Sequence, residues 1–165
     1  MRVLIFTEGT LIMHRSARGL GREVIVKQVH DAKDSSIYEW KTYIPIGNAV
    51  QKLRAWKKQG LEILYLTSRT KPTEIKAIRD VLLKYGFPEG QLLFRQGDEE
   101  YKDVVERVMP DIIVEDNCES IGGKGEMVYT YIKPELKRRV KSIAVREFGG
   151  IDHLPDSVSK LKVQV

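Results

Sequence analysis

The sequence has little cysteine, little histidine and no long hydrophobic run, and each shortage excludes a class of protein. The single cysteine, Cys118, cannot form an intramolecular disulfide, and one thiol cannot make a zinc cluster. The three histidines, His14, His30 and His153, do not have the spacing of metal ligands. The apolar run over residues 1–6 is too short for a signal peptide or a membrane span. We therefore expect a cytoplasmic protein with no membrane association.

The most basic segment of the chain contains no aromatic residue. The net charge is +5, and lysine and arginine gather in the run from Lys133 to Lys141. No aromatic side chain lies within that run to stack on a base, which argues against nucleic acid as a partner. Elsewhere the charges are mixed in sign, as on a solvated surface. The basic balance also suits a phosphorylated small molecule as ligand.

Short apolar runs alternate with helical periodicity along the whole chain. At 165 residues the chain fits a single domain, residues 1–165, with a core that needs no disulfide. Gly60 and Gly86 stand where glycines end helices, and Asp98 is a candidate N-cap. This alternation predicts an α/β, three-layer, Rossmann-like domain with a mostly parallel five-stranded sheet. The expected strands are 2–7, 61–66, 91–94, 111–114 and 142–145, and the expected helices cover 46–56, 75–85 and 101–108.

Residues 13–45 do not fit a minimal strand–helix unit. Val24 to Ala32 has the pattern of one helix, and Ile37 to Ile44 is expected to be extended. An insertion at this point, after the first strand, predicts a small cap or flap over a site at the end of the sheet.

Polar residues follow three of the expected strands directly. Glu8-Gly9-Thr10 follows the first, Thr67-Ser68-Arg69 the second, and Glu115-Asp116 the fourth. Ligands of open parallel sheets bind at the carboxyl ends of the strands, so these groups are expected to converge. Carboxylate oxygens suit Mg²⁺, whereas hydroxyls and a guanidinium suit phosphate oxygens.

These strand ends resemble the haloacid dehalogenase superfamily. Its first motif, Asp-x-Asp-Gly-Thr, is matched by Phe6-Thr7-Glu8-Gly9-Thr10. Its second motif, a Thr or Ser after a strand, is matched by Thr67. Its motif lysine is matched by Lys102, and its acidic pair by Glu115-Asp116. The resemblance covers residues 1 to about 150 and implies a small or capless member of this fold. Its first motif is degenerate, because Phe6 stands where the family has the aspartate that attacks phosphorus.

The resemblance implies a role for each matched residue. Glu8 and Lys102 take the catalytic positions, Glu8 as the acid/base and Lys102 as the neutraliser of phosphate charge. Thr10, Thr67, Ser68 and Arg69 are expected to bind substrate, and Glu115 and Asp116 to hold Mg²⁺. From the residues alone, Thr10 could instead cap the next segment, and Thr67 and Ser68 could cap the helix near Pro72. Lys102 and Arg69 could equally be surface residues.

Three functions remain open at this point. The first is a non-hydrolytic or weakly active protein that binds a phosphorylated small molecule, and it rests on Phe6. The second is a Mg²⁺-dependent phosphatase or nucleotidase that uses Glu8 or a metal-bound water. The third, a receiver-like signalling domain, needs a phosphoacceptor aspartate after the third strand, where Asp98 is better explained as a helix cap.

Overall fold

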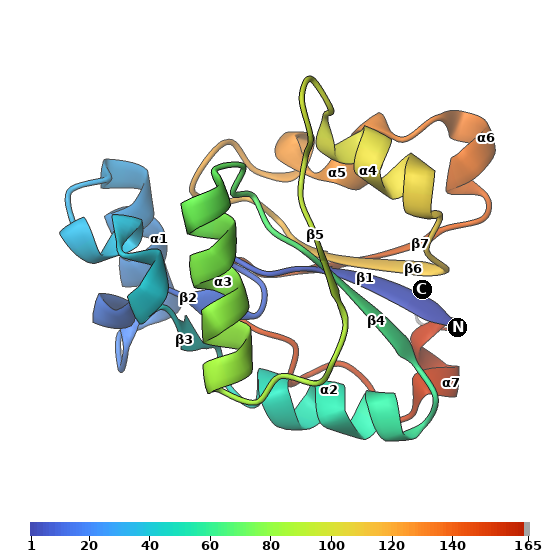
Figure 1. Ribbon diagram of the computed structural model, residues 1–165, viewed down its shortest axis with the longest axis horizontal. Helices are drawn as coiled ribbons and strands as arrows, with labels where there is room; N and C mark the ends of the chain where they lie inside the picture. Colours follow the sequence, from blue (N-terminus) through green and yellow to red (C-terminus); the bar gives the residue numbers. More distant parts are fainter. Residues whose placement is uncertain (164–165) are drawn as a thin grey trace.

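The computed structural model describes residues 1–163 as a twisted five-stranded sheet with helices on both faces (Figure 1). The strand order is β5-β4-β1-β6-β7, and every pair is parallel. β1 therefore occupies the centre, with Ile5 paired to Tyr65 of β4 and Val114 of β6. This arrangement is the parallel α/β sheet that the alternation of elements predicts.

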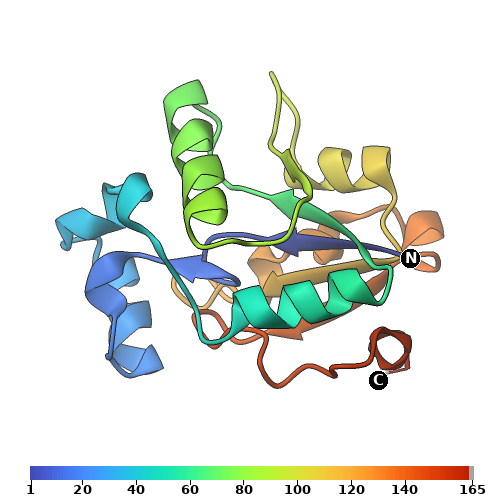
Figure 2. The same cartoon turned by 60° about the horizontal axis from the view of Figure 1, so that its bottom comes forward.

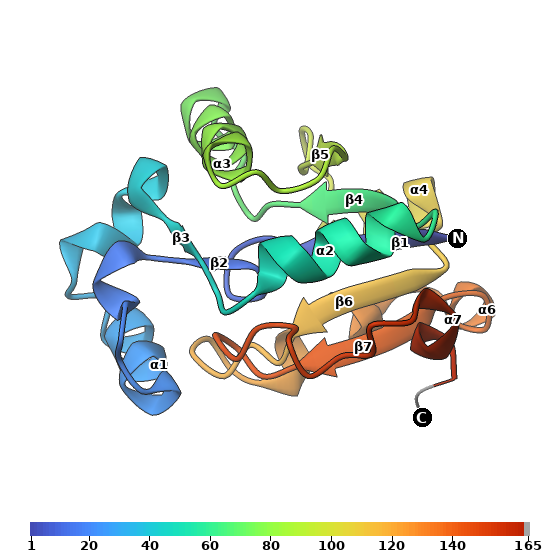
Figure 3. The same ribbon diagram turned by 90° about the horizontal axis from the view of Figure 1, so that it is seen from below.

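The strands agree with the sequence prediction to within two residues at each end. The main-sheet strands are β1 (Arg2–Phe6), β4 (Glu62–Leu66), β5 (Gln91–Leu93), β6 (Ile112–Asp116) and β7 (Lys141–Val145). The middle of β1, residues 3–5, and the start of β6, residues 112–114, are apolar and buried, which is the pattern of central parallel strands. Arrowheads of β4, β6 and β7 point the same way, toward the insertion (Figure 3).

Helices fill the intervals between strands as expected, with some additions. The long ones are α2 (Ala49–Lys58), α3 (Pro72–Lys84) and α4 (Tyr101–Val108). The short segments that periodicity did not reveal are η4 (Lys124–Glu126), α5 (Val128–Tyr131), α6 (Pro134–Lys137) and α7 (Val158–Leu161). Each is three or four residues long, too short to show a helical period.

The helix ends confirm some capping predictions and correct others. Gly60 follows α2 with φ 86°, as a glycine that ends a helix does. The N-cap predicted at Asp98 is wrong, because Glu100 caps α4 and forms a capping box with Asp103. Thr67 and Ser68 do not cap α3 either, since its N-cap is Lys71, directly before Pro72 at the first helical position.

Two apolar clusters hold the layers together, one on each face of the sheet. Alternate residues of β1 point to opposite faces, so Val3 and Ile5 join one cluster and Leu4 the other. The first cluster packs α2, α3 and α7 against the sheet and contains the fully buried Trp56. The second packs α4 and α5 on the opposite face. Helices therefore sandwich the sheet, and its strand ends are left to hold a site.

The insertion forms a small lobe at the carboxyl ends of the strands (Figure 2). It contains β2 (Ile12–Met13), η1 (Arg15–Ala17), α1 (Arg22–Asp31), η2 (Ser35–Tyr38), η3 (Trp40–Thr42) and β3 (Ile44–Pro45). The helix expected near Val24 to Ala32 is confirmed as α1. The extended segment expected from Ile37 to Ile44 is wrong, because most of it winds into two 3₁₀ turns, and only its end pairs with β2.

Within residues 1–163, every helix is too short or too polar to pass through a lipid bilayer.

Candidate functional site

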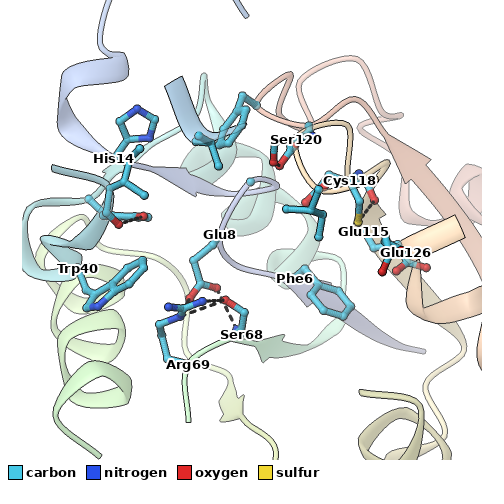
Figure 4. A pocket seen from close by; sticks show the side chains of 18 of the residues that line it. Phe6, Glu8, His14, Trp40, Ser68, Arg69, Glu115, Cys118, Ser120 and Glu126 are labelled. Atoms are coloured by element: carbon cyan, nitrogen blue, oxygen red, sulfur yellow. Dashed lines mark hydrogen bonds and ion pairs between the residues drawn. The ribbon is translucent and has the colours of Figure 1, made fainter. Parts of the chain in front are cut away.

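A pocket of about 450 Å³ lies between the strand ends and the insertion. Its floor includes Phe6 and Glu8 from the end of β1, and its opposite wall includes Trp40 and Tyr43 from the insertion. The end of β6 contributes Glu115 and Asp116. The convergence predicted from the strand ends is therefore present in the structure, with the insertion beside it (Figure 4).

The carboxylate of Glu8 is held by donors from two strand ends. Its Oε1 accepts a 2.6 Å hydrogen bond from the Thr67 hydroxyl, and its Oε2 accepts one from the Ser68 amide at 3.3 Å. The Thr7 hydroxyl donates to Oε2 as well, and Arg69 Nε lies 3.6 Å from Oε1. We call the four donors Thr7, Thr67, Ser68 and Arg69 the anion cradle. In this structure Glu8 itself is the anion in the cradle.

Arg69 is fixed in the cradle from three directions. Its guanidinium lies 4.1 Å from the centre of the Trp40 ring, and it donates to the Ser68 hydroxyl from Nε and from one terminal nitrogen, at 3.1 and 2.7 Å. With the Glu8 ion pair, these contacts join the insertion to the end of β4 (Figure 4). Arg69 is therefore a pocket residue, and its cation–π contact with Trp40 orients the guanidinium.

Phe6, the residue that the resemblance aligns with an aspartate, presents an aromatic ring to the pocket. The ring packs edge-on against Tyr101 of α4, with centroids 5.6 Å apart and an interplanar angle of 67°. Such a pair contributes about 0.5–1.5 kcal/mol beyond its buried area. A phenyl ring offers neither an attacking oxygen nor a metal ligand, so the pocket has an apolar surface at this position.

Glu115 and Asp116 turn to opposite faces of the sheet. Adjacent strand residues alternate, so Glu115 points to α5, where both oxygens accept backbone amides, from Val128 at 2.7 Å and Tyr129 at 3.0 Å. Asp116 points the other way and accepts the Thr10 hydroxyl at 3.1 Å. Burial raises the pKa of Glu115 to about 7 and raises that of Asp116 as well.

This donor set does not fit a resident magnesium ion. Mg²⁺ requires several oxygen ligands in octahedral geometry, and both oxygens of Glu115 are already bonded to amides. Phe6 adds no oxygen. Over residues 1–163, nowhere do three or more His, Cys, Asp or Glu side chains stand close enough to hold a metal. Asp116 is the one carboxylate of the expected pair that faces Gly9 and Thr10.

Lys102 lies outside the pocket lining. It is on α4 with a partly exposed side chain, and its Nζ is 2.7 Å from Glu100. That ion pair raises the pKa of Lys102 through a hydrogen bond and charge attraction. The cation beside the Phe6–Tyr101 pair is Arg95, whose guanidinium lies 4.3 Å from the centre of the Tyr101 ring. Arg95 follows β5, and ligands of parallel sheets bind at the carboxyl ends of strands, so the sequence could have indicated Arg95 as a site residue.

Thr10 holds the loop rather than the pocket. Its side chain is fully buried and bonded to Asp116, and it is not among the lining residues. Neighbouring Gly9 has φ 81°, and a Cβ there would lie 2.7 Å from Asp116 Oδ2. The Gly-Thr part of the first motif therefore allows the β1 loop to pack closely on the end of β6.

Sequence reasoning missed Glu147 and the aromatic wall. Glu147, which follows β7, is buried, lines the pocket and accepts bonds from the Ser120 amide and hydroxyl at 2.7 and 2.6 Å. Burial raises its pKa. A search for polar residues just after the fifth expected strand, 142–145, would have identified Glu147. Trp40 and Tyr43 had no such signal beyond the gathering of aromatics in residues 38–43.

Cys118 lines the pocket but is not activated as a nucleophile. Burial and the nearby carboxylates raise the pKa of its thiol to about 12, so the thiolate is not formed at neutral pH.

The sheet order and the site at its strand ends define a protein with the haloacid dehalogenase-type fold. Comparison with solved structures supports this fold at low sequence identity. A class C acid phosphatase from Bacillus anthracis, solved with tungstate bound, superposes over 98% of this chain and 76% of its own, with a TM-score of 0.55 and 13% identity. Two chains from the Pnkp1/Rnl/Hen1 RNA repair complex give TM-scores of 0.51 and 0.54 over 88% of this chain, at 14% and 13% identity.

The chain spans less than half the length of those RNA repair chains, 43% and 46%. No protein-family model and no curated protein matches the sequence. These likenesses therefore establish the fold, and the function has to be argued from the pocket.

Proposed function

We propose that this protein binds a phosphorylated small molecule in the pocket and does not hydrolyse it. The observation that carries the proposal is that Phe6 and Glu8 stand at the two positions where the family's first motif has aspartates. Hydrolysis in this fold needs a carboxylate at residue 6, and Phe6 supplies an aromatic ring packed on Tyr101. The anion cradle remains, with the Glu8 carboxylate seated in it.

The proposed ligand has an anionic end and an apolar body. Phosphoryl oxygens accept the same donors as a carboxylate, so a phosphate would replace Glu8 at Thr67, Ser68 and Arg69. The apolar body would lie against Trp40 and Phe6. Residues 13–45 would then act as a cap over the ligand. Recognition by two or three fixed polar groups in a largely apolar cavity is the usual design of a small-molecule site.

The contacts of Glu8 argue against its use as a replacement nucleophile or base. Three hydrogen bonds and an ion pair fix both carboxylate oxygens inside the cradle. An attacking oxygen would need to point instead at a phosphorus bound by those same donors. Magnesium enters this proposal only as an ion carried by the ligand's phosphate, near Asp116, because Mg²⁺ is commonly held by one carboxylate plus phosphate oxygens.

The test combines turnover and binding on the same preparation. A panel of phosphomonoesters with Mg²⁺ is assayed for phosphate release, and the same compounds are titrated by calorimetry. We expect saturable binding of at least one compound without turnover, and loss of that binding in Arg69→Gln. Ordinary phosphatase rates in the wild type, abolished by Glu8→Gln, would show that Glu8 catalyses hydrolysis and the proposal is wrong.

A further inference from the structure

The basic run from Lys133 to Lys141 gathers its charge around a second groove, far from the pocket. The run passes through α6 and turns into the start of β7, at the end of the sheet opposite the insertion (Figure 1). A cavity of about 480 Å³ lies there, lined by Arg138, Arg139 and Lys141 together with Lys162 after α7. We call this the basic groove.

Three of the four cations in the basic groove have no Asp or Glu partner among residues 1–163. Within residues 1–163, Arg138, Arg139 and Lys141 lie beyond ion-pair distance, 4.0 Å, of every Asp or Glu. Lys162 pairs with Asp111 at 3.6 Å, and Asp111 is the one acidic residue of the lining. The groove therefore keeps a clear excess of positive charge.

Backbone carbonyl groups hold some of these cations in place. Lys141 Nζ donates to the Lys162 carbonyl at 3.3 Å, and neighbouring Lys137 Nζ donates to the Thr130 carbonyl at 2.8 Å. A carbonyl fixes an ammonium group without cancelling its charge. Asp111 also accepts the Arg2 amide at 2.7 Å, and that bond and the nearby cations lower its pKa. The groove therefore has four cations in its lining and one carboxylate, Asp111, which is already bonded to the Arg2 amide.

We propose that the basic groove is a binding site for an oligophosphate anion. Arginine guanidinium groups bind phosphate oxygens through paired N–H donors, and two adjacent arginines offer two such forks. Ser142 and Tyr129 also line the groove, and the Tyr129 hydroxyl donates to the Lys137 carbonyl at 3.4 Å. The anion would relieve the mutual repulsion of Arg138, Arg139 and Lys141.

The aromatic content of the groove favours an oligophosphate over a nucleic-acid strand. Among the described residues, 1–163, Tyr129 is the one aromatic residue that lines the groove, and Lys137 Nζ lies 5.3 Å from the centre of its ring. Single-stranded nucleic acids are usually held by aromatic rings on which successive bases stack. The basic groove has cations for phosphates but no row of rings for bases.

The test measures calorimetric binding of tripolyphosphate to the full chain. We expect saturable binding that weakens about tenfold or more in the double variant Arg138→Gln/Arg139→Gln, because charge-assisted hydrogen bonds are lost. The matched control is Lys58→Gln/Arg79→Gln, which removes the same charge from exposed sites on α2 and α3. It should change the affinity less than about twofold at moderate salt, because screening weakens distant charges.

Folding does not confound this comparison. Neither arginine side chain forms a hydrogen bond or ion pair within residues 1–163, so their replacement should leave the melting temperature unchanged or slightly raised. Three outcomes overturn the proposal. They are no saturable binding by the wild type, equal weakening by the control, and weakening by Arg69→Gln alone, which would place the anion in the pocket. Tighter binding of a single-stranded oligonucleotide than of tripolyphosphate would identify nucleic acid as the ligand instead.

Discussion

At the scale of the residue, Phe6 and Glu8 are the two positions at which this site departs from the first motif that it resembles. Phe6 removes the oxygen that would attack phosphorus, and Glu8 extends one methylene further than aspartate. That extra reach brings the Glu8 carboxylate onto Thr67 and Ser68. Under the proposed function both departures act in the same direction, because Phe6 supplies no attacking oxygen and the Glu8 carboxylate occupies the donors that a phosphate would use.

Neutralising Glu8 should open the anion cradle. In Glu8→Gln we expect inorganic phosphate to bind at least tenfold more tightly than in the wild type, because the competing negative charge is gone. Two charges ~4 Å apart interact by ~4 kcal/mol at an effective dielectric constant of ~20, which exceeds the ~1.4 kcal/mol that a tenfold change requires. Calorimetric titration measures the effect.

The control for this prediction is Glu89→Gln, which removes the same charge from an exposed loop position that does not line the pocket. Phosphate affinity that rises equally in both variants would indicate a general charge effect, and the occupied-cradle interpretation would then fail. Tungstate, a phosphate-like anion, offers a second probe of the same subsite.

At the scale of the element, the loop after β1 joins three strand ends. Gly9 N–H donates to the Ile12 carbonyl, and the Gly9 carbonyl accepts the Phe148 amide at 2.7 Å. Thr10 bonds Asp116 at the end of β6. The loop therefore sets the positions of Phe6 and Glu8 relative to β6 and to the segment after β7.

Gly9→Ala should destabilise the protein by about 1–3 kcal/mol. Alanine strains a backbone at φ 81°, and its Cβ would lie 2.7 Å from Asp116 Oδ2, which is already bonded to Thr10. Urea unfolding measures the loss. Gly19→Ala is the matched control, because φ is 75° there and nothing lies within 4 Å of the added Cβ. If the two variants lose equal stability, the close approach to Asp116 contributes nothing.

At the scale of the whole molecule, the sheet was predictable from the sequence and the inner geometry of the site was not. Central parallel strands are buried on both faces, so β1 and β6 appear as unbroken apolar runs and their ends are easily located. The short 3₁₀ turns of the insertion have no period to detect. The predicted strand ended at residue 114, whereas β6 extends to Asp116, so the alternation that turns Glu115 and Asp116 to opposite faces could not be applied to them from the sequence.

Three buried carboxylates make the stability of the whole chain depend on pH. Glu115, Asp116 and Glu147 are all buried near the strand ends, and burial raises the pKa of each. A carboxyl group with a raised pKa binds its proton more tightly in the folded state. The folded protein then holds more protons than the unfolded chain between the two pKa values, so stability falls as pH rises through that window.

Glu115 gives this prediction its range and its test. Its pKa rises from 4.5 to about 7, which corresponds to roughly 3 kcal/mol of stability lost between those pH values. In Glu115→Gln the free energy of unfolding should fall much less over that range, because the amide does not titrate and its carbonyl can still accept an α5 amide. Urea unfolding at a series of pH values measures the slope. Glu89→Gln, at an exposed position, should keep the wild-type slope. Wild-type stability that rises steadily from pH 4.5 to 7 would mean that the two amide bonds outweigh burial and hold Glu115 in its charged form.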